Sequence, residues 1–153
     1  MNNNYIVVSA LALTLCSAAL AQSKPEDEIR YRQSVMNVVG RAFGPMMAMA
    51  QDKIPYNKEI VSRNVQILET LAPLPWTAFA SGTDKGAPTK ADMKVWSEAA
   101  KFKEHSEKLQ QAVGKLGQAA RGGDEKTVKA ALGDLGKACK SCHDDFRLKD
   151  FRT

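Results

Sequence analysis

The sequence predicts an all-α fold, an antiparallel four-helix bundle, and three observations indicate it. The chain has 153 residues, of which 44% are hydrophobic and 25% are charged, a size and composition that suit one domain with a hydrophobic core. Apolar residues recur at steps of three and four along four stretches, as in helices with one buried face. Most connections between these stretches are short, so neighbouring helices should run antiparallel.

The N-terminal segment, residues 1–21, is interpreted as a cleaved signal peptide, which leaves residues 22–153 as the folded domain. Residues 5–20 are largely apolar, end near Ala19-Leu20-Ala21 and are followed by polar residues. Small residues on both sides of Leu20 are typical of a secretory cleavage site. The apolar run falls short of the roughly 20 residues that a membrane span needs. We therefore expect an exported protein without a membrane segment after cleavage.

The first helix is expected at about residues 25–51. Pro25 followed by three acidic residues is typical of a first helical turn. The pair Gly44-Pro45 should bend or break the helix near its end. The residues that share its apolar face are Ile29, Arg32, Met36, Val39, Phe43, Met46, Met47 and Ala50.

The second helix should begin after Asn57, a residue type that caps helices, and end before Pro73 and Pro75. Its apolar face contains Val61, Val65, Leu68 and Leu71. Residues 73–91 then form the one long connection. A connection of that length in a small domain is typical of a functional segment.

The third helix is expected at about residues 92–121, where Gly122-Gly123 stops it. Asp124 can cap the fourth helix, which should continue to Arg147 in its last turns. The apolar positions of the fourth helix are Val128, Ala131, Leu132, Leu135, Ala138, Cys139, Cys142 and Phe146.

The chemical signature of the sequence is Cys139-Lys140-Ser141-Cys142-His143, which contains every cysteine left after residue 21. This Cys-x-x-Cys-His pattern is that of covalent c-type haem attachment. The two thiols add to the haem vinyl groups as thioethers, and the adjacent imidazole reaches the iron. The sequence therefore predicts one haem c per chain, held by Cys139 and Cys142, with His143 as its iron ligand.

Three other uses of the two cysteines stay open at this point. A redox dithiol would follow a strand, and none is expected before Cys139. A structural zinc site needs about four ligands, and His105 is the only histidine outside the motif. The third alternative is a structural disulfide. Because charged residues surround His105 in the sequence, we expect it to be a surface histidine and not a second iron ligand.

The three motif side chains should lie on one side of the fourth helix. Positions three and four residues apart are neighbours on a helix surface, and these positions belong to the apolar face. The haem is therefore expected along the fourth helix, with its faces covered by the other helices and by the long connection.

With its motif near the C-terminus and on the last of four helices, the sequence resembles cytochrome c′, the class II c-type cytochromes. The resemblance spans the whole domain and includes the segments 24–27, 31–34, 74–79, 95–100 and 142–147. It implies a periplasmic homodimer formed through the first two helices. It also implies a high-spin, five-coordinate haem that binds NO and CO and discriminates against O₂.

The resemblance also implies roles for three residues of the first helix. Arg32 and Gln33 match the pair near the haem propionates, and Met36 matches the residue that blocks the vacant axial site. From the residues alone, Met36 is a core methionine and Arg32 could be an exposed helix residue. Because an unpaired guanidinium on an apolar face would be costly, a propionate partner is favoured for Arg32.

Further roles are implied for Arg147, Trp76 and Phe79. Arg147 matches the basic residue beside the proximal imidazole, where it could contact a ligand on that side of the haem. By position alone, it could simply complement the negative end of the helix. Trp76 and Phe79 match aromatic residues packed around the haem. The loop at residues 83–93 looks longer than in close relatives, so its propionate contacts are not carried over.

Two other functions remain as alternatives. Some class II relatives are low-spin electron carriers in which a methionine of the first helix binds the iron. If this chain is such a carrier, Met36 is the sixth iron ligand. A peroxidase-like enzyme lacks support, because the sequence shows no distal histidine with a polar partner. The formal net charge of +5 is spread along every helix, so no nucleic-acid-binding patch is expected. Redox partner proteins are compatible with either class II function.

Overall fold

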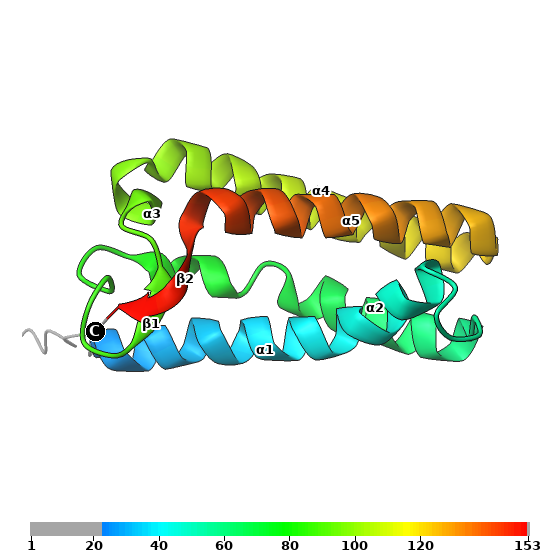
Figure 1. Ribbon diagram of the computed structural model, residues 1–153, viewed down its shortest axis with the longest axis horizontal. Helices are drawn as coiled ribbons and strands as arrows, with labels where there is room; N and C mark the ends of the chain where they lie inside the picture. Colours follow the sequence, from blue (N-terminus) through cyan, green and yellow to red (C-terminus); the bar gives the residue numbers. More distant parts are fainter. Residues whose placement is uncertain (1–22, 153) are drawn as a thin grey trace, which may run out of the picture.

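The computed structural model describes residues 23–152, which form a four-helix bundle (Figure 1). The long helices are α1 (Pro25–Ala50), α2 (Lys58–Leu71), α4 (Ala99–Gly122) and α5 (Glu125–Phe146). The short elements are the 3-10 helix η1 (Pro75–Phe79), β1 (Thr89–Ala91), α3 (Lys94–Ser97) and β2 (Arg147–Arg152). The expected signal peptide, residues 1–21, lies outside the described residues. Within residues 23–152, no helix has the length and apolar character of a membrane span.

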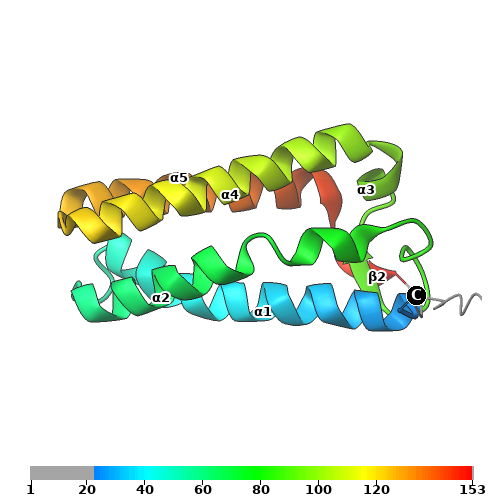
Figure 2. The ribbon, with the colours of Figure 1, turned by 180° about the vertical axis from the view of Figure 1, so that it is seen from behind.

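The four long helices pack in a ring, and the predicted antiparallel bundle is confirmed. The pairs in contact are α1 with α2, α2 with α4, α4 with α5, and α5 with α1. Figures 1 and 2 show α1 and α2 as one layer and α4 and α5 as the other. Short turns join the helices of each layer, whereas the long segment between α2 and α4 crosses from one layer to the other.

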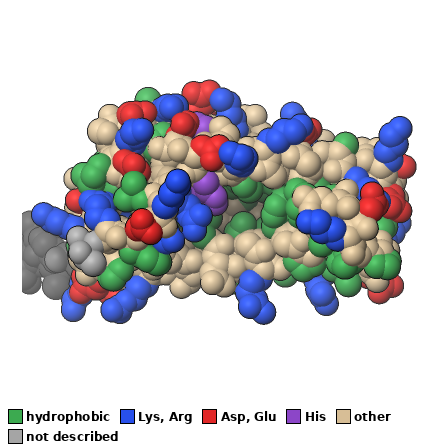
Figure 3. Space-filling model, in the orientation of Figure 1, with side chains coloured by type: hydrophobic (Ala, Val, Ile, Leu, Met, Phe, Trp, Pro, Cys, Tyr) green, Lys and Arg blue, Asp and Glu red, His purple; other side chains and the backbone are tan. Residues whose placement is uncertain are grey.

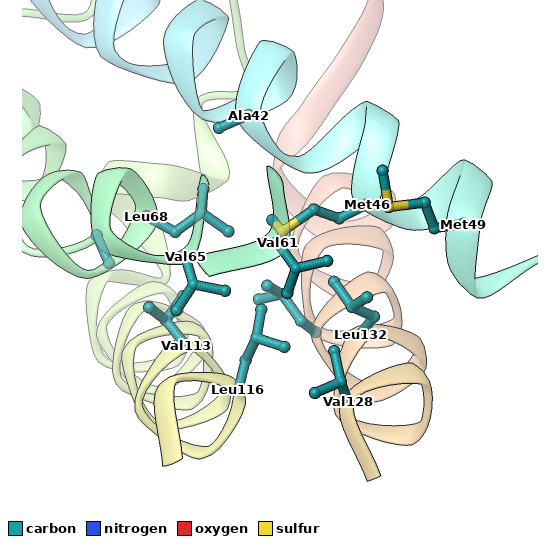
Figure 4. Packing of buried hydrophobic residues seen from close by; sticks show 12 residues of the cluster. Ala42, Met46, Met49, Val61, Val65, Leu68, Val113, Leu116, Val128 and Leu132 are labelled. Atoms are coloured by element: carbon teal, nitrogen blue, oxygen red, sulfur yellow. The ribbon is translucent and has the colours of Figure 1, made fainter. Parts of the chain in front are cut away.

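The hydrophobic core fills the half of the bundle that contains the α1–α2 and α4–α5 turns. Side chains from all four helices converge there (Figure 4). The buried residues are Ala42, Met46, Met49, Val61, Val65, Leu68, Ala72, Val113, Leu116, Val128, Leu132 and Leu135. Because each helix contributes to one cluster, burial of its apolar face holds the helix in the bundle.

The helix ends follow the expected signals. The side-chain oxygen Oδ1 of Asn57 accepts a hydrogen bond from the Ile60 backbone N–H at 2.9 Å. Asp124 caps α5 in the same way, with Oδ2 2.7 Å from the Thr127 nitrogen. At the end of α4, Gly123 has a φ of 78°, in the left-handed region that glycine adopts without a steric penalty.

Two expectations concerned helix continuity. The first helix was expected to bend or break at Gly44-Pro45, and it is not broken there, since α1 continues through Pro45 to Ala50. Proline removes one helical hydrogen bond, but the fully buried Met46 side chain next to it holds this last part of α1 against the core. The expected helix at residues 92–121 is instead two helices, α3 and α4, which meet at Glu98 with φ −117° and ψ 42°.

The two short strands were not expected. β1 and β2 pair antiparallel, with Thr89 opposite Arg152 and Ala91 opposite Arg147. The prediction that Arg147 belongs to the last turns of the fourth helix was therefore wrong. It follows α5 with an extended backbone, φ −120° and ψ 121°, and begins β2.

A cavity at the centre of the core should lower the free energy of unfolding. Leu132 is fully buried, with 0% exposure, whereas Leu74 is 38% exposed. We expect Leu132→Ala to lower the free energy of unfolding by about 3 kcal/mol, because the substitution removes apolar contacts and leaves a cavity. Leu74→Ala should lower it by less than about 1 kcal/mol. Denaturant titration of the two variants would measure both values, and equal losses would contradict this account of the core.

Candidate haem-binding site

The motif residues lie on α5 at the edge of a cavity of about 540 Å³. Cys142 and His143 line this cavity, and Cys139, one turn earlier, packs against the hydrophobic core. The volume lies within the range of pockets that enclose cofactors and other small molecules. On the face shown in Figure 3, a hollow opens between the two helical layers.

The structure brings all the other site residues expected from the sequence to the same cavity. Arg32, Gln33 and Met36 line it from α1, Trp76 and Phe79 from η1, and Arg147 from the start of β2. The long connection reaches the cavity because it crosses between the layers at this end of the bundle.

Aromatic side chains form a continuous wall beside the motif. The ring of Phe102, on α4, has its centroid 4.9 Å from that of Phe79 and 5.3 Å from that of Phe146, in edge-to-face arrangements. The Trp76 ring lies 5.8 Å from Phe102. The Trp76 indole N–H donates a hydrogen bond to the Ala72 carbonyl at 2.6 Å, which orients the ring. These contacts make the wall apolar and rigid.

Arg32 ties α1 to the connecting segment. Its guanidinium is 3% exposed and donates four hydrogen bonds, to the Ala78 carbonyl, to the hydroxyl and carbonyl of Thr83, and to the Thr89 hydroxyl. Burial lowers the pKa of Arg32 to about 10, and repulsion by Arg152 contributes to the shift. Arg32 lines the cavity as expected, but most of its donors bind the chain itself.

The charges around the cavity are all positive. Arg32, Lys90 and Arg147 line it, whereas its lining contains no aspartate or glutamate. Burial, followed by the nearby charge of Arg147, lowers the pKa of His143. This shift favours the neutral imidazole, the form that has a nitrogen lone pair for a metal ion.

The thiols are protected from ionisation. Burial raises the pKa of Cys142 to about 11, with smaller contributions from Cys139 and Asp145. Burial also raises the pKa of Cys139. Protonated thiols are poor nucleophiles for disulfide exchange.

Size, polarity and chemistry of the cavity all fit haem c. The aromatic wall suits the faces of a porphyrin, and the cations suit two propionates in a lining without acids. Cys139 and Cys142 would supply the two thioether sulfurs, and His143 would supply an imidazole from the same side of α5.

Comparisons with known proteins agree with this chemistry. A sequence model of the Cytochrome C' family matches residues 27–147. The chain is 47% identical over 126 residues to the cytochrome c′ of Rubrivivax gelatinosus, a match that covers 82% of this chain and 98% of that protein. The chain belongs to the cytochrome c′ family. The haem predicted from the motif is thereby confirmed as haem c, the covalent cofactor of cytochromes c′.

Solved cytochrome c′ structures share this fold. The crystal structure from Rubrivivax gelatinosus has a TM-score of 0.79 and 46% identity, and the match covers 82% of this chain and 98% of that one. A nitric oxide complex of a mutant from Alcaligenes xylosoxidans has a TM-score of 0.77 and 40% identity, covering 84% and 99%. A carbon monoxide-bound variant from the same organism has a TM-score of 0.76 and 41% identity, covering 83% and 98%.

The expected surface position of His105 was wrong. Its side chain is 8% exposed, and its Nε2 lies 3.1 Å from Oδ2 of Asp145 on α5. Its ring packs edge-on against Phe146, 5.5 Å between centroids. The charged neighbours in sequence point outward, whereas His105 itself faces α5. It does not line the haem cavity.

Sequence reasoning missed several residues that line the cavity. Val95 and Phe102 carried a signal that could have found them, because both are apolar and lie seven residues apart, about two turns of the helix expected at residues 92–121. Asn37 follows Met36 in the sequence and is exposed at the cavity. Lys90 and Phe151 carried no such signal, since their place depends on the pairing of β1 with β2.

Asp145 provides a pH test of the contact between α4 and α5. A hydrogen bond and the charge of Lys101, 3.0 Å away, lower the pKa of Asp145, and His105 contributes. Because the folded pKa lies below the unfolded value of about 3.9, this stabilisation is present above the unfolded pKa. It is lost as pH falls through the folded pKa.

We therefore expect Asp145→Asn to be less stable than the unmodified chain near neutral pH, with the difference disappearing in acid. Denaturant titrations between about pH 6 and about pH 3 would measure this difference. Asp150→Asn, an exposed position outside the cluster, is the control. A difference that stays constant over this range would contradict the role of the Asp145 carboxylate.

Proposed function

We propose that this chain is a periplasmic, gas-binding cytochrome c′ in which His143 is the only protein ligand of the haem iron, so that one axial position is open to NO and CO. We propose that it is a binding protein and not an enzyme. The observation that carries the proposal is that the cavity lining contains one imidazole, His143 on α5, and is otherwise mainly apolar. The nitric oxide and carbon monoxide complexes of the Alcaligenes xylosoxidans relative support the choice of gases.

The haem supplies an iron atom at which diatomic gases bind. The chain decides which ligands reach it. Met36 is half-buried in the cavity lining and restricts the space available on the α1 side. The amide of Gln33 is engaged with the Pro88 carbonyl at 2.9 Å. The apolar side chains of the lining are Met36, Trp76, Phe79, Ala91, Val95, Phe102, Phe146 and Phe151.

Such a lining favours NO and CO over O₂. Bound O₂ is the more polar of these ligands and gains most from a hydrogen-bond donor. A pocket with mainly apolar walls offers few hydrogen-bond donors to bound O₂, whereas bound NO and CO need no such donor. Discrimination between the gases therefore follows from the polarity of the walls.

Electron transfer with Met36 as a sixth iron ligand is the second candidate. The position of the Met36 thioether in the same cavity as His143 is the observation that favours it. In that case the cavity would be closed to gases until the thioether moved away, and the protein would serve a redox partner.

Optical titration with CO and NO separates the two candidates. We expect a high-spin ferric spectrum and stoichiometric CO binding to the ferrous protein. A weak ferric band at about 695 nm, typical of His/Met ligation, together with slow or absent gas binding, would contradict the open position.

The variant Met36→Ala sharpens this test. We expect CO to bind about tenfold faster, because the smaller side chain leaves more room beside the iron, a change of about 1.4 kcal/mol in the barrier. Ile54→Ala, at an exposed position in the α1–α2 turn, should leave the rate unchanged. An unchanged rate in Met36→Ala would show that the thioether does not restrict entry.

Arg147 is proposed to contact a gas ligand on the His143 side of the haem. The Arg147 side chain lines the cavity, and its charge acts on the His143 imidazole. Its backbone N–H also donates to the His143 carbonyl, which holds the two residues together.

We expect Arg147→Ala to change the rate or the final absorption spectrum of the NO complex, and Arg147→Lys to retain part of the effect. Stopped-flow mixing with NO measures both quantities. The control is Arg41→Ala, which removes an exposed arginine on α1. Identical kinetics and spectra for Arg147→Ala and the unmodified protein would refute the contact.

Localisation and assembly follow from the same family assignment. We infer export to the periplasm from the apolar segment 5–20 and the site after Ala21. A homodimer through α1 and α2 is supported by apolar side chains on the outer face of α1, where Tyr31 is 42% and Val38 is 46% exposed.

A further inference from the structure

The C-terminal strand lies, except for Arg147, beyond the residues that the family model matches. The family match ends at residue 147, and residues 148–152 continue as β2. In Figure 1, β2 leaves the end of α5 and runs across the end of the bundle toward β1. We call the pair of strands β1 and β2 the strap.

Side-chain hydrogen bonds hold the strap in place. The Arg152 guanidinium donates to the Asp84 carbonyl at 2.8 Å and to the Ala91 carbonyl at 3.3 Å. The Lys90 ammonium donates to the Lys149 carbonyl at 2.7 Å. A chain terminus without such contacts would fray, whereas these contacts fasten β2 to the loop beside the cavity.

Two side chains of the strap line the haem cavity, Lys90 from β1 and Phe151 from β2. Phe151 is 62% exposed, the most exposed of the large apolar side chains described. The Lys90 Nζ lies 4.8 Å from the centre of the Phe151 ring, a cation–π contact. An aromatic ring with an ammonium group beside it suits the edge of a flat apolar molecule that ends in carboxylates.

Lys90 is better placed than Arg32 to bind such a carboxylate. Arg32 already donates four hydrogen bonds to the chain, whereas Lys90 uses one of its three N–H groups. Within residues 23–152, no carboxylate lies within salt-bridge distance of Lys90. Its charge is therefore available to an anionic ligand.

We propose that the strap is part of the haem-binding site, where Lys90 binds a haem propionate and Phe151 covers the edge of the macrocycle. The strap thereby shields this edge from solvent and from large redox reagents. The proposal rests on the bound haem c and not on whether the axial position opposite His143 is open.

Nuclear magnetic resonance of the unmodified holoprotein tests the contact directly. We expect the Phe151 ring protons and the Lys90 ε-methylene protons to be displaced by the haem ring current or the iron, and to show cross-relaxation with haem protons. Lys53 and Tyr56, at the opposite end of the bundle, are the reference residues. Ordinary shifts for both Phe151 and Lys90, without cross-relaxation to the haem, would overturn the proposal.

Two variants of the holoprotein test the consequences. Lys90→Met keeps most of the apolar stem and removes the charge, so the midpoint potential of the one-electron ferric–ferrous couple should fall, because a nearby cation favours the less positive ferrous state. Phe151→Ala should make oxidation of the ferrous haem by ferricyanide severalfold faster, because the edge becomes accessible.

The matched controls are Lys53→Met and Ile54→Ala, both exposed in the α1–α2 turn. A potential shift in Lys90→Met no larger than in Lys53→Met would overturn the role of Lys90. A rate in Phe151→Ala no faster than in Ile54→Ala would overturn the role of Phe151. The absorption spectrum of the same samples reports the spin state, so a low-spin iron would contradict the proposed open position and leave the strap assignment standing.

Discussion

The structure depends on one constraint, that two thiols and an imidazole on a single face of α5 must all reach the same flat cofactor. Side chains of the bundle cannot occupy the space in front of that face. The hydrophobic core therefore fills only the half of the bundle around Leu116 and Leu132, and the other half is a cavity with an aromatic wall. Haem bound in this cavity would complete the interior of this half, because its apolar faces would take the place of core side chains.

Arg32 shows how the cavity half is held together without a packed core. A buried guanidinium is costly unless it is hydrogen-bonded, and here carbonyl and hydroxyl groups of the connecting segment satisfy it. The same hydrogen bonds hold that segment against α1. The connection can therefore place Trp76 and Phe79, both on η1, in the aromatic wall.

The strap and the His105 contact hold the C-terminal end of α5, which carries the proposed iron ligand, His143. His105 and Lys101 on α4 both reach Asp145, and β2 extends from Arg147 to the loop beside α3. Neither contact involves the motif itself. Together they hold the residues that follow His143 against α4 and against the loop at Asp84, so the position of this end of α5 depends on elements far apart in the sequence.

The sequence by itself determined the four helices, their caps at Asn57 and Asp124, the haem motif, and the resemblance that placed Met36 and Arg147 beside it. These features depend on local periodicity and on residues close together in the chain. Only the tertiary structure decided that His105 is buried, that the third helix divides at Glu98, and that Phe151 joins the cavity. Each of these depends on which segment packs alongside: α5 against His105, the connecting segment against α3, and β1 against β2. A helical pattern specifies the face that is buried, but not the partner that buries it.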